Sequence, residues 1–335
     1  MRSTSPIMSD VALRAGVSKI TVSRVFSQPD TVSESTRRKV ERAAAEIDFV
    51  PDRMAGALKS GVSNIVAVIV PSLRNSTFVA TLQGLSDGLT KHGLVLSIGL
   101  NDFSRFKEHH VATELMSLKL RGLVLMATVH SPEMERLIKR ARYPVVEVGD
   151  LLEESKGVTV SFSNKDASRT MTEHLINRGY RNIAFATLPL DQSDRAQQRL
   201  AGYREALQAA RITYDPRLLI ESDAGHKAGA ATLAKLLDRK TPVDAYFGCG
   251  DVLAIGALLE ARRRKMRIPQ DLAIASFDDH DICEVTDPPL TSMMIPRYEI
   301  GYRCAEFIVD AKLPVVQKRK VSLDLGFNLV VREST

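Results

Sequence analysis

Hydrophobic positions follow two different patterns on either side of residue 64. Before it, apolar residues recur at the three- to four-residue spacing of short helices. After it, short continuous apolar runs alternate with longer segments of helical periodicity. In the first part of this region the predicted strands are residues 65–70, 94–98, 122–126 and 144–148, and the predicted helices are 78–92, 106–118 and 132–140.

The same alternation recurs further along the chain. Strands are predicted at residues 183–186, 218–220, 245–247 and 272–275, and helices at 165–178, 197–211, 226–238 and 252–265. Continuous apolar strands that alternate with amphipathic helices are typical of parallel sheets covered by helices on both faces. The pattern therefore predicts two doubly wound α/β lobes rather than one very wide sheet.

The N-terminal segment has the pattern of a helix-turn-helix. Val11, Ala12 and Ala15 form the apolar face of a first helix, and Gly16 follows where the chain must turn sharply. Ser18 is a suitable N-cap for a second helix. A second helix docked in this way presents its N-terminal residues to base edges in a major groove. The residues predicted to contact DNA there are Ser18, Lys19, Ile20, Thr21, Ser23 and Arg24.

The alternative for this segment is an ordinary helical hairpin. A third helix, predicted from Ser33 to about Asp48, favours the helix-turn-helix because the motif needs it to bury the apolar sides of the first two helices. Its outward face is basic and its inward face is apolar. The outward residues are Arg37, Arg38, Lys39 and Arg42, and the inward residues are Val40, Ala43, Ala44 and Ile47.

Three motifs resemble the headpiece and hinge of the lac/galactose repressor family. They are V-S-x-x-T-V-S-R-V at 17–25, V-S-E-S-T-R at 32–37 and F-V-P-D-R-M-A-G-A-L at 49–58, and the resemblance continues along essentially the whole chain. Three further motifs resemble the gluconate-type branch of the family: V-S-F-S-N at 160–164, H-D-I at 280–282 and L-D-L-G-F at 323–327. The resemblance implies that paired hinge helices enter the minor groove, with Arg53, Ala55 and Leu58 as contacts and Leu58 as a wedge that kinks DNA. A plain linker at 51–58 is the alternative.

The resemblance also implies the domain organisation. We expect a helix-turn-helix headpiece at residues 6–50, a hinge helix and linker at 51–62, and an effector-binding and dimerisation domain at 63–335 that is similar to periplasmic binding proteins. The chain would cross between its lobes three times. Lobe one is expected at about 63–162 and 294–321, and lobe two at about 163–292 and 322–335.

Composition narrows the class of protein. The net charge is +6, and residues 1–60 hold ten Lys and Arg against seven Asp and Glu, which fits phosphate neutralisation by the headpiece. No apolar run reaches the length of a transmembrane helix, and the N-terminus lacks the apolar core of a signal peptide. Three cysteines without metal-ligand spacing fit reduced thiols. A cytoplasmic protein that does not contact membranes is expected.

The sequence contains none of the catalytic motifs that we searched for as signs of an enzyme. The sequence contains no phosphate-binding P-loop, no G-x-S-x-G elbow and no H-E-x-x-H pair. Asp278-Asp279-His280-Asp281 is rich in potential metal ligands, but four consecutive side chains rarely converge on one ion. A solvated loop with one or two ligand contacts is the better interpretation. We therefore expect no catalytic residues, no metal and no cofactor.

Ligands of open α/β sheets bind beyond the carboxyl ends of the strands. Arg199, in R-L-A-G-Y, resembles the family's cleft arginine, whose planar fork suits a carboxylate or vicinal hydroxyls. Asp278 follows a strand, and the resemblance implies that it accepts hydrogen bonds from sugar hydroxyls. Each of these residues also has a simpler interpretation. Arg199 could be a solvated arginine on a helix, Asp278 the N-cap of the following turn, and Phe78 a core residue of its helix. The candidate effector-binding residues are Asn75, Phe78, Asn164, Arg199, Asp251 and Asp278.

Departures from the family pattern point to an anionic effector. Gly250, Ser163 and Ile295 stand where Asn, Asp and Gln are frequent, and loss of a carboxylate makes the cleft less repulsive to an anion. The sequence thus predicts a repressor that binds operator DNA as a homodimer and is released by a sugar acid such as gluconate or a keto-gluconate. The carboxylate would contact Arg199. The rival hypothesis is a sugar-binding transport or sensory component with the same two-lobed fold.

Overall fold

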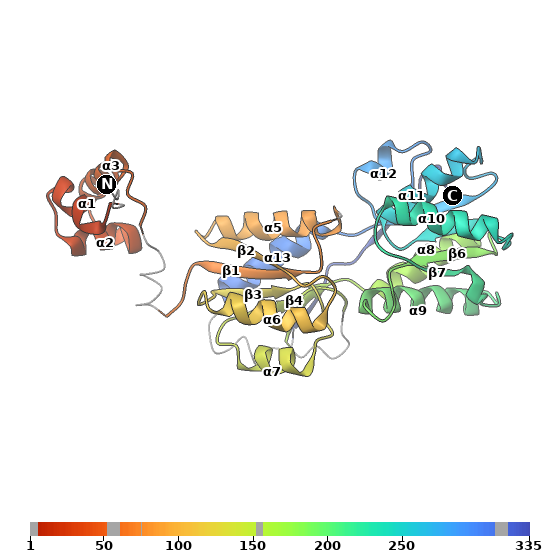
Figure 1. The fold of residues 1–335 in the computed structure, drawn as a ribbon, viewed down its shortest axis with the longest axis horizontal. Coiled ribbons are helices and arrows are strands. Elements are labelled where there is room, and N and C mark those ends of the chain that lie inside the picture. The colour runs from red at the N-terminus through yellow and green to blue at the C-terminus, as the bar shows by residue number, and fades with distance from the viewer. Residues whose placement is uncertain (1–5, 52–60, 75, 152–156, 312–320) are drawn as a thin grey trace, which may run out of the picture. The chain divides into compact units, whose positions relative to one another are not determined.

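The computed structural model describes residues 6–51, 61–74, 76–151, 157–311 and 321–335. The chain divides into two compact units, Met1–Ser63 and Asn64–Thr335. Among the described residues, the first unit holds only helices and the second holds every strand (Figure 1). Two sheets within the second unit give it two lobes, as the hydrophobic pattern predicts.

The first unit is a three-helix headpiece. Helices α1 (Met8–Ala15), α2 (Lys19–Ser27) and α3 (Glu34–Glu46) pack around small apolar side chains, with Gly16 in the left-handed conformation between the first two (φ +62°). Ser18 caps α2 by accepting a hydrogen bond from the Thr21 amide (3.1 Å), which confirms the predicted cap. Of the residues predicted to face inward, Ile47 is only half-buried, and the others are buried: Val11, Ala12, Ala15, Val40, Ala43 and Ala44. Val22 and Val25 of α2 complete this core.

The first lobe of the second unit is built on a sheet of parallel strands. Along the sheet the order is β11-β5-β4-β3-β1-β2. Helices α5 (Val79–Thr90) and α13 (Arg297–Asp310) cover one face, and α6 (Arg105–Met116) and α7 (Pro132–Arg140) cover the other (Figure 1). The strands are β1 (Ile65–Val70), β2 (Val95–Leu100), β3 (Gly122–Leu125), β4 (Val145–Glu147), β5 (Val158–Ser161) and β11 (Val321–Asp324).

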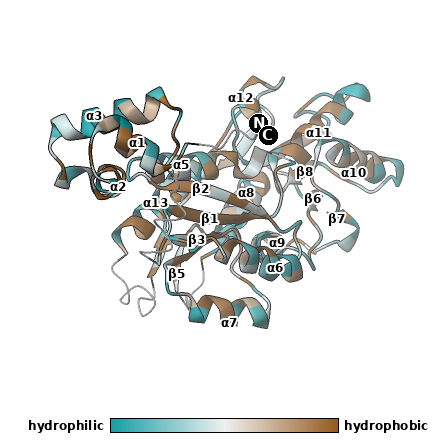
Figure 2. Cartoon of the chain, turned by 60° about the vertical axis from the view of Figure 1, so that its left-hand side comes forward, coloured by the Kyte–Doolittle hydropathy of each residue, from teal (hydrophilic) through white to brown (hydrophobic). Residues whose placement is uncertain are grey.

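The second lobe repeats this design with one change, because β12 runs antiparallel to β10. Its sheet has the order β12-β10-β9-β8-β6-β7, and the strands are apolar between more polar outer helix faces (Figure 2). Helices α8 (Asn164–Asn177) and α9 (Asp194–Ala209) pack on one face, α10 (His226–Asp238) and α11 (Asp251–Arg263) on the other, and α12 (Ile282–Val285) follows β9. The strands are β6 (Ile183–Thr187), β7 (Leu219–Glu221), β8 (Ala245–Gly248), β9 (Ala273–Asp278), β10 (Thr291–Met294) and β12 (Asn328–Val330).

The chain passes between the two sheets three times. The crossings follow β5, β10 and β11. β11 pairs with β5 over its whole length, so the third crossing comes after Asp324 and the expected lobe boundary at residue 321 is too early. The short strands beside the crossings have three or four residues, too few for their apolar pattern to predict them.

Helix α9 begins at Asp194, three residues before the predicted start at residue 197. The reason is a cap, because Ser193 accepts a hydrogen bond from the Ala196 amide (3.2 Å). The earlier start places Arg195 in the first helical turn. That position matters for the cavity described below.

Helices on one face of each sheet approach closely at glycines. A Cβ added at Gly84 in α5 would lie 2.0 Å from the Tyr298 carbonyl oxygen in α13, and one at Gly301 would lie 1.9 Å from the Thr81 oxygen. Gly256 in α11 makes the same kind of contact with α10, at 2.1 Å from the His226 oxygen. Side chains at these positions would force the paired helices apart.

Candidate functional site

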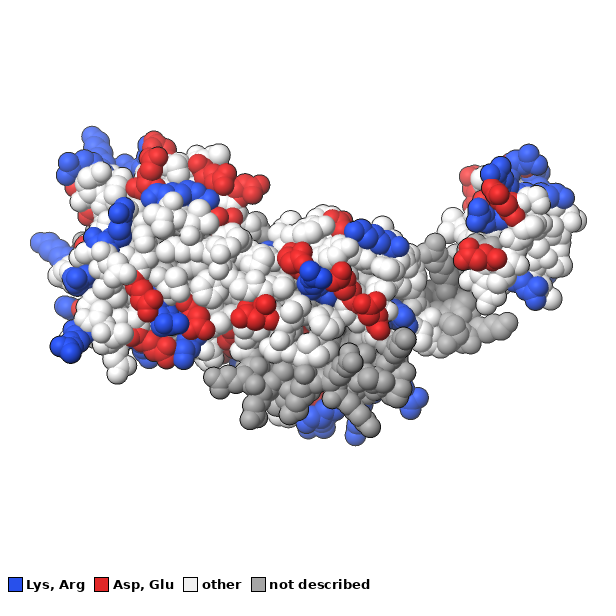
Figure 3. All heavy atoms as spheres, turned by 180° about the vertical axis from the view of Figure 1, so that it is seen from behind, with Lys and Arg blue, Asp and Glu red and all other residues white. Residues whose placement is uncertain are grey.

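The start of α2 presents an exposed set of side chains that suits DNA contact. Lys19, Ile20, Ser23 and Arg24 are exposed, and Ile20 keeps 66% of its surface accessible. Lys19 and Arg24 form no ion pair within the described part of the chain, so both charges are available to phosphates or base edges. Lys and Arg side chains are visible on the headpiece among fewer acidic ones (Figure 3).

Ser18 and Thr21 are held by each other at the same helix start. The Ser18 hydroxyl lies 2.9 Å from that of Thr21 and also accepts from its amide. The three predicted hinge contacts, Arg53, Ala55 and Leu58, lie outside the described residues. Their predicted role rests on the resemblance alone.

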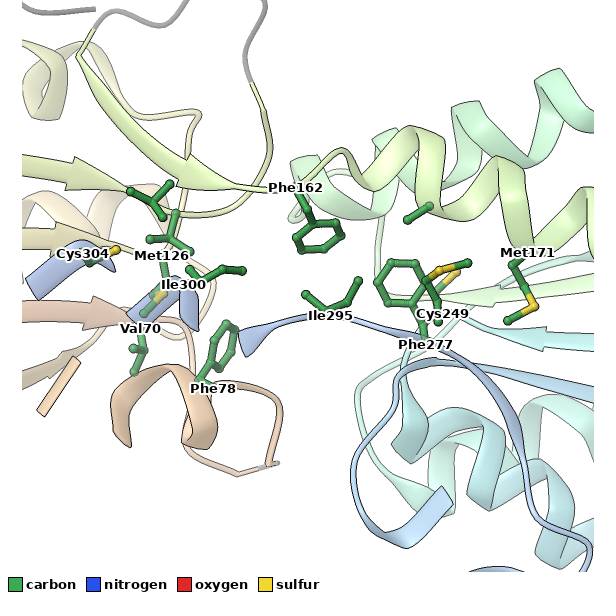
Figure 4. Close-up of a cluster of buried hydrophobic side chains, with 14 of the residues drawn as sticks. Val70, Phe78, Met126, Phe162, Met171, Cys249, Phe277, Ile295, Ile300 and Cys304 are labelled. Atoms are coloured by element: carbon green, nitrogen blue, oxygen red, sulfur yellow. The ribbon is translucent and has the colours of Figure 1, made fainter. Parts of the chain in front are cut away.

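A cavity of about 590 Å³, including the open space at its mouth, lies within the second unit and is lined by residues of both lobes. Phe78 lines it from the first lobe, and Arg199, Cys249 and Asp278 line it from the second. Figure 4 shows Phe162 and Ile295 on the segments that join the two lobes. The charged residues of the lining are Arg195, Arg199, Arg297 and Asp278.

Arg199 is fixed in the cavity wall by neutral partners. Its Nε donates to Asn164 Oδ1 (2.8 Å) and its Nη1 to the Cys249 carbonyl (2.8 Å), while its guanidinium lies 3.7 Å from the centre of the Phe277 ring. Burial lowers the pKa of Arg199 to about 10, which still leaves it charged at neutral pH. Its charge is therefore preorganised in the wall without a carboxylate bound to it.

Asp278 is paired with a cation that the sequence analysis did not select. Arg297, at the start of α13, donates to Asp278 Oδ1 through Nε (3.2 Å) and Nη2, and both side chains are buried. Burial alone would raise the pKa of Asp278, but the charges of Arg297 and Arg199 outweigh it and hold that pKa below its ordinary value. Asp278 also has φ +96°, a strained backbone of the kind that clusters at functional sites.

Two predicted effector residues do not line the cavity. Asn164 is fully buried, donates to the Gly149 carbonyl (2.7 Å) and orients Arg199. The Asp251 carboxylate accepts from the His280 amide (2.8 Å) and contacts His280 Nδ1 (2.6 Å). Both residues are thus placed to position their neighbours rather than to touch an effector, and Asn75, a third candidate, lies outside the described residues.

The acidic loop at 278–281 does not converge on one point. Asp278 faces Arg297, Asp279 pairs with Arg332 (2.6 Å), and His280 turns to Asp251. Phe78, by contrast, is 4% exposed and does line the cavity.

Comparison with known proteins decides the family. Residues 7–52 match the bacterial regulatory proteins of the lacI family, and residues 172–335 match the periplasmic binding protein-like domain. The HTH-type transcriptional regulator GntR of Pseudomonas aeruginosa is 38% identical over 98% of this chain and 96% of its own. The chain belongs to the lacI family of bacterial regulatory proteins.

Further matches agree with this assignment. GntR of Escherichia coli K12 is 32% identical over 98% of each chain. The lac repressor dimer bound to operator and the anti-inducer ONPF is 25% identical, with a TM-score of 0.86 over 99% of each chain. A complex of the transcriptional regulator CelR with cellobiose is 30% identical, with a TM-score of 0.71 over 98% of this chain and 100% of the other.

Membership in the lacI family makes this protein a DNA-binding transcription regulator, not an enzyme. It also excludes the rival hypothesis of a sugar-binding transport component without regulatory DNA binding. None of the described helices has the length and apolar character needed to span a bilayer.

Two charged residues of the lining, Arg195 and Arg297, were not predicted from the sequence. Arg297 lies in the segment 294–321, which was expected only to complete lobe one, and Arg195 lies outside the predicted bounds of its helix. Arg195 lies between the carboxyl end of a predicted strand and the start of the next predicted helix. Ligands of open α/β sheets bind at such positions, so this placement could have identified it.

Proposed function

We propose that this lacI-family regulator is a cytoplasmic repressor that binds a pseudo-palindromic operator as a homodimer and is released by a sugar acid of the gluconate type. The observation that carries the proposal is the charge of the cavity lining, where three arginines stand against one aspartate. Asp278 offsets Arg297, which leaves two cations for an anionic ligand.

A sugar acid fits both parts of this lining. Its carboxylate would meet a guanidinium fork, and its hydroxyls would meet Asp278 and the remaining arginine donors. A neutral sugar would leave two partly desolvated cations without a counter-charge, which costs free energy. The relatives named GntR are 32–38% identical to this chain, which supports an effector of the gluconate type.

Calorimetry on the full chain tests the effector. We expect gluconate or a keto-gluconate to bind at least tenfold more tightly than glucose or cellobiose, at about 1.4 kcal/mol per factor of ten. Tight binding of a neutral sugar with no response to any sugar acid would overturn the effector assignment.

A mobility-shift assay tests the DNA part independently. DNA upstream of the protein's own gene should be retarded, and the effector should release it. Operator affinity should also fall steeply as salt rises, because phosphate contacts release counterions. Salt-insensitive binding would contradict the proposed use of Lys19 and Arg24.

A further inference from the structure

The three arginines of the cavity differ in the hydrogen bonds and ion pairs that their guanidinium groups form within the protein. Arg297 is neutralised by Asp278, and Arg199 is held by the Asn164 amide oxygen and the Cys249 carbonyl. Arg195 has no hydrogen bond or ion pair with any described residue. Among the described residues that line the cavity, it is the one arginine whose five N–H donors form no hydrogen bond to the protein.

Arg195 is also poorly placed for solvation by water alone. It is partly buried, and burial lowers its pKa below the ordinary value for arginine. One face of the guanidinium lies 5.3 Å from the centre of the Phe78 ring, which belongs to the other lobe. A partly desolvated cation without an acceptor is unfavourable, and a bound anion would offset that penalty.

Carboxylates near Arg195 do not supply that acceptor. Those whose charges act on it each hold another group: Asp194 accepts from the Thr128 hydroxyl of the other lobe (2.9 Å), Asp278 accepts from Arg297, and Asp150 accepts from the Asn164 amide (3.0 Å).

We propose that Arg195 binds the carboxylate of the effector and sets the preference for an acid over a neutral sugar, an inference that rests on the proposed function. Arg199 then contacts hydroxyls with the donors that Asn164 and Cys249 leave free. This assignment moves the carboxylate away from Arg199, where the sequence analysis put it.

The test compares gluconate with glucitol, which has a CH₂OH group in place of the carboxylate. Affinities of the full chain are measured by calorimetry for wild type, Arg195→Gln and Arg195→Lys. The matched control is Arg204→Gln, because Arg204 lies on the same helix and over an aromatic ring, Tyr214 (4.5 Å), but outside the cavity lining.

Arg195→Gln should weaken gluconate binding by about 10- to 100-fold and leave glucitol binding unchanged. Arg195→Lys should keep part of the preference, since it retains the charge but loses the fork. Arg204→Gln should bind both compounds as wild type does.

Two results would overturn the proposal, and they are distinguishable. If Arg195→Gln keeps the wild-type ratio of gluconate to glucitol affinity, Arg195 does not read the carboxylate, although the effector class stands. If wild type binds neither gluconate nor any keto-gluconate, the proposed function fails and this assignment fails with it.

Discussion

At the scale of single residues, the sequence was sufficient to predict which residues lie near the cavity, but not which of their side chains face it. Phe78 precedes α5, Asp278 ends β9 and Arg199 lies in the second turn of α9, and all three line the cavity. Asn164 and Asp251 occupy equally suitable positions in sequence, yet both are turned to protein partners. Which of two nearby polar side chains faces a ligand depends on hydrogen bonds between residues far apart in the chain, which no local pattern contains.

A second residue-scale feature is a buried histidine between two glutamates in the first lobe. His130 Nδ1 lies 2.8 Å from Glu108 and its Nε2 lies 3.0 Å from Glu147, with all three side chains at most 9% exposed. Burial disfavours the imidazolium, but hydrogen bonds and the charges of both glutamates outweigh it and raise the pKa of His130 to about 9.

This arrangement predicts a pH-dependent stability. The pKa of His130 is higher in the folded than in the unfolded chain, where it is about 6.5, so its contribution is complete below pH 6.5 and is lost as pH rises through 9. The loss is about 3 kcal/mol in the free energy of unfolding. Urea unfolding of wild type and His130→Gln between pH 6 and 9.5 should show the difference between them shrinking as pH rises. Parallel curves would contradict the prediction.

At the scale of elements, the helix pair α5 and α13 depends on close backbone approach. Gly84→Ala would place a methyl group 2.0 Å from the Tyr298 carbonyl oxygen, a backbone atom that cannot rotate away. We expect a loss of about 1–3 kcal/mol in the free energy of unfolding, the range typical of overpacking.

The matched control is Gly157→Ala. An added Cβ there meets nothing closer than Glu147 Oε2 at 3.8 Å, an ordinary contact. Its free energy of unfolding in urea should stay within about 0.5 kcal/mol of wild type. Equal losses in both variants would show that helix separation is not the cause.

The second element-scale prediction concerns α2. Because Lys19 and Ile20 are exposed at its start, exchanging them should change which operator is preferred, by roughly 1–3 kcal/mol per altered base contact. Selection from a randomised operator pool, followed by mobility shift on the selected and original sites, measures this. Uniform weakening on every sequence would mean that these residues contact only the DNA backbone.

At the scale of the whole molecule, periodicity was sufficient to predict two α/β lobes and a helical headpiece. Long apolar runs such as Ile65–Val70 are buried on both sides, so their sequence alone identifies them. The pairing of β11 with β5 joins residues about 160 positions apart, and three or four residues carry too little pattern to reveal it.

The two-unit organisation gives a quantitative prediction about regulation. If gluconate lowers operator affinity by some factor, operator must lower gluconate affinity by the same factor, because coupling between two binding sites is reciprocal. Titrations of gluconate with and without operator, and of operator with and without gluconate, give both factors. A factor of one in both titrations would contradict the release of operator by gluconate.

The three chain crossings also determine when each lobe can be finished during protein synthesis. The headpiece is continuous in sequence, but the first lobe receives α13 and β11 only after most of the second lobe has been made. Roughly 160 residues separate β5 from β11, which is about 8 to 32 s of translation at typical bacterial rates. Throughout that time the α5 face that α13 will cover and the open edge of β5 are exposed on the nascent chain. A chaperone that shields apolar surface near the ribosome would therefore act on the first lobe rather than on the headpiece.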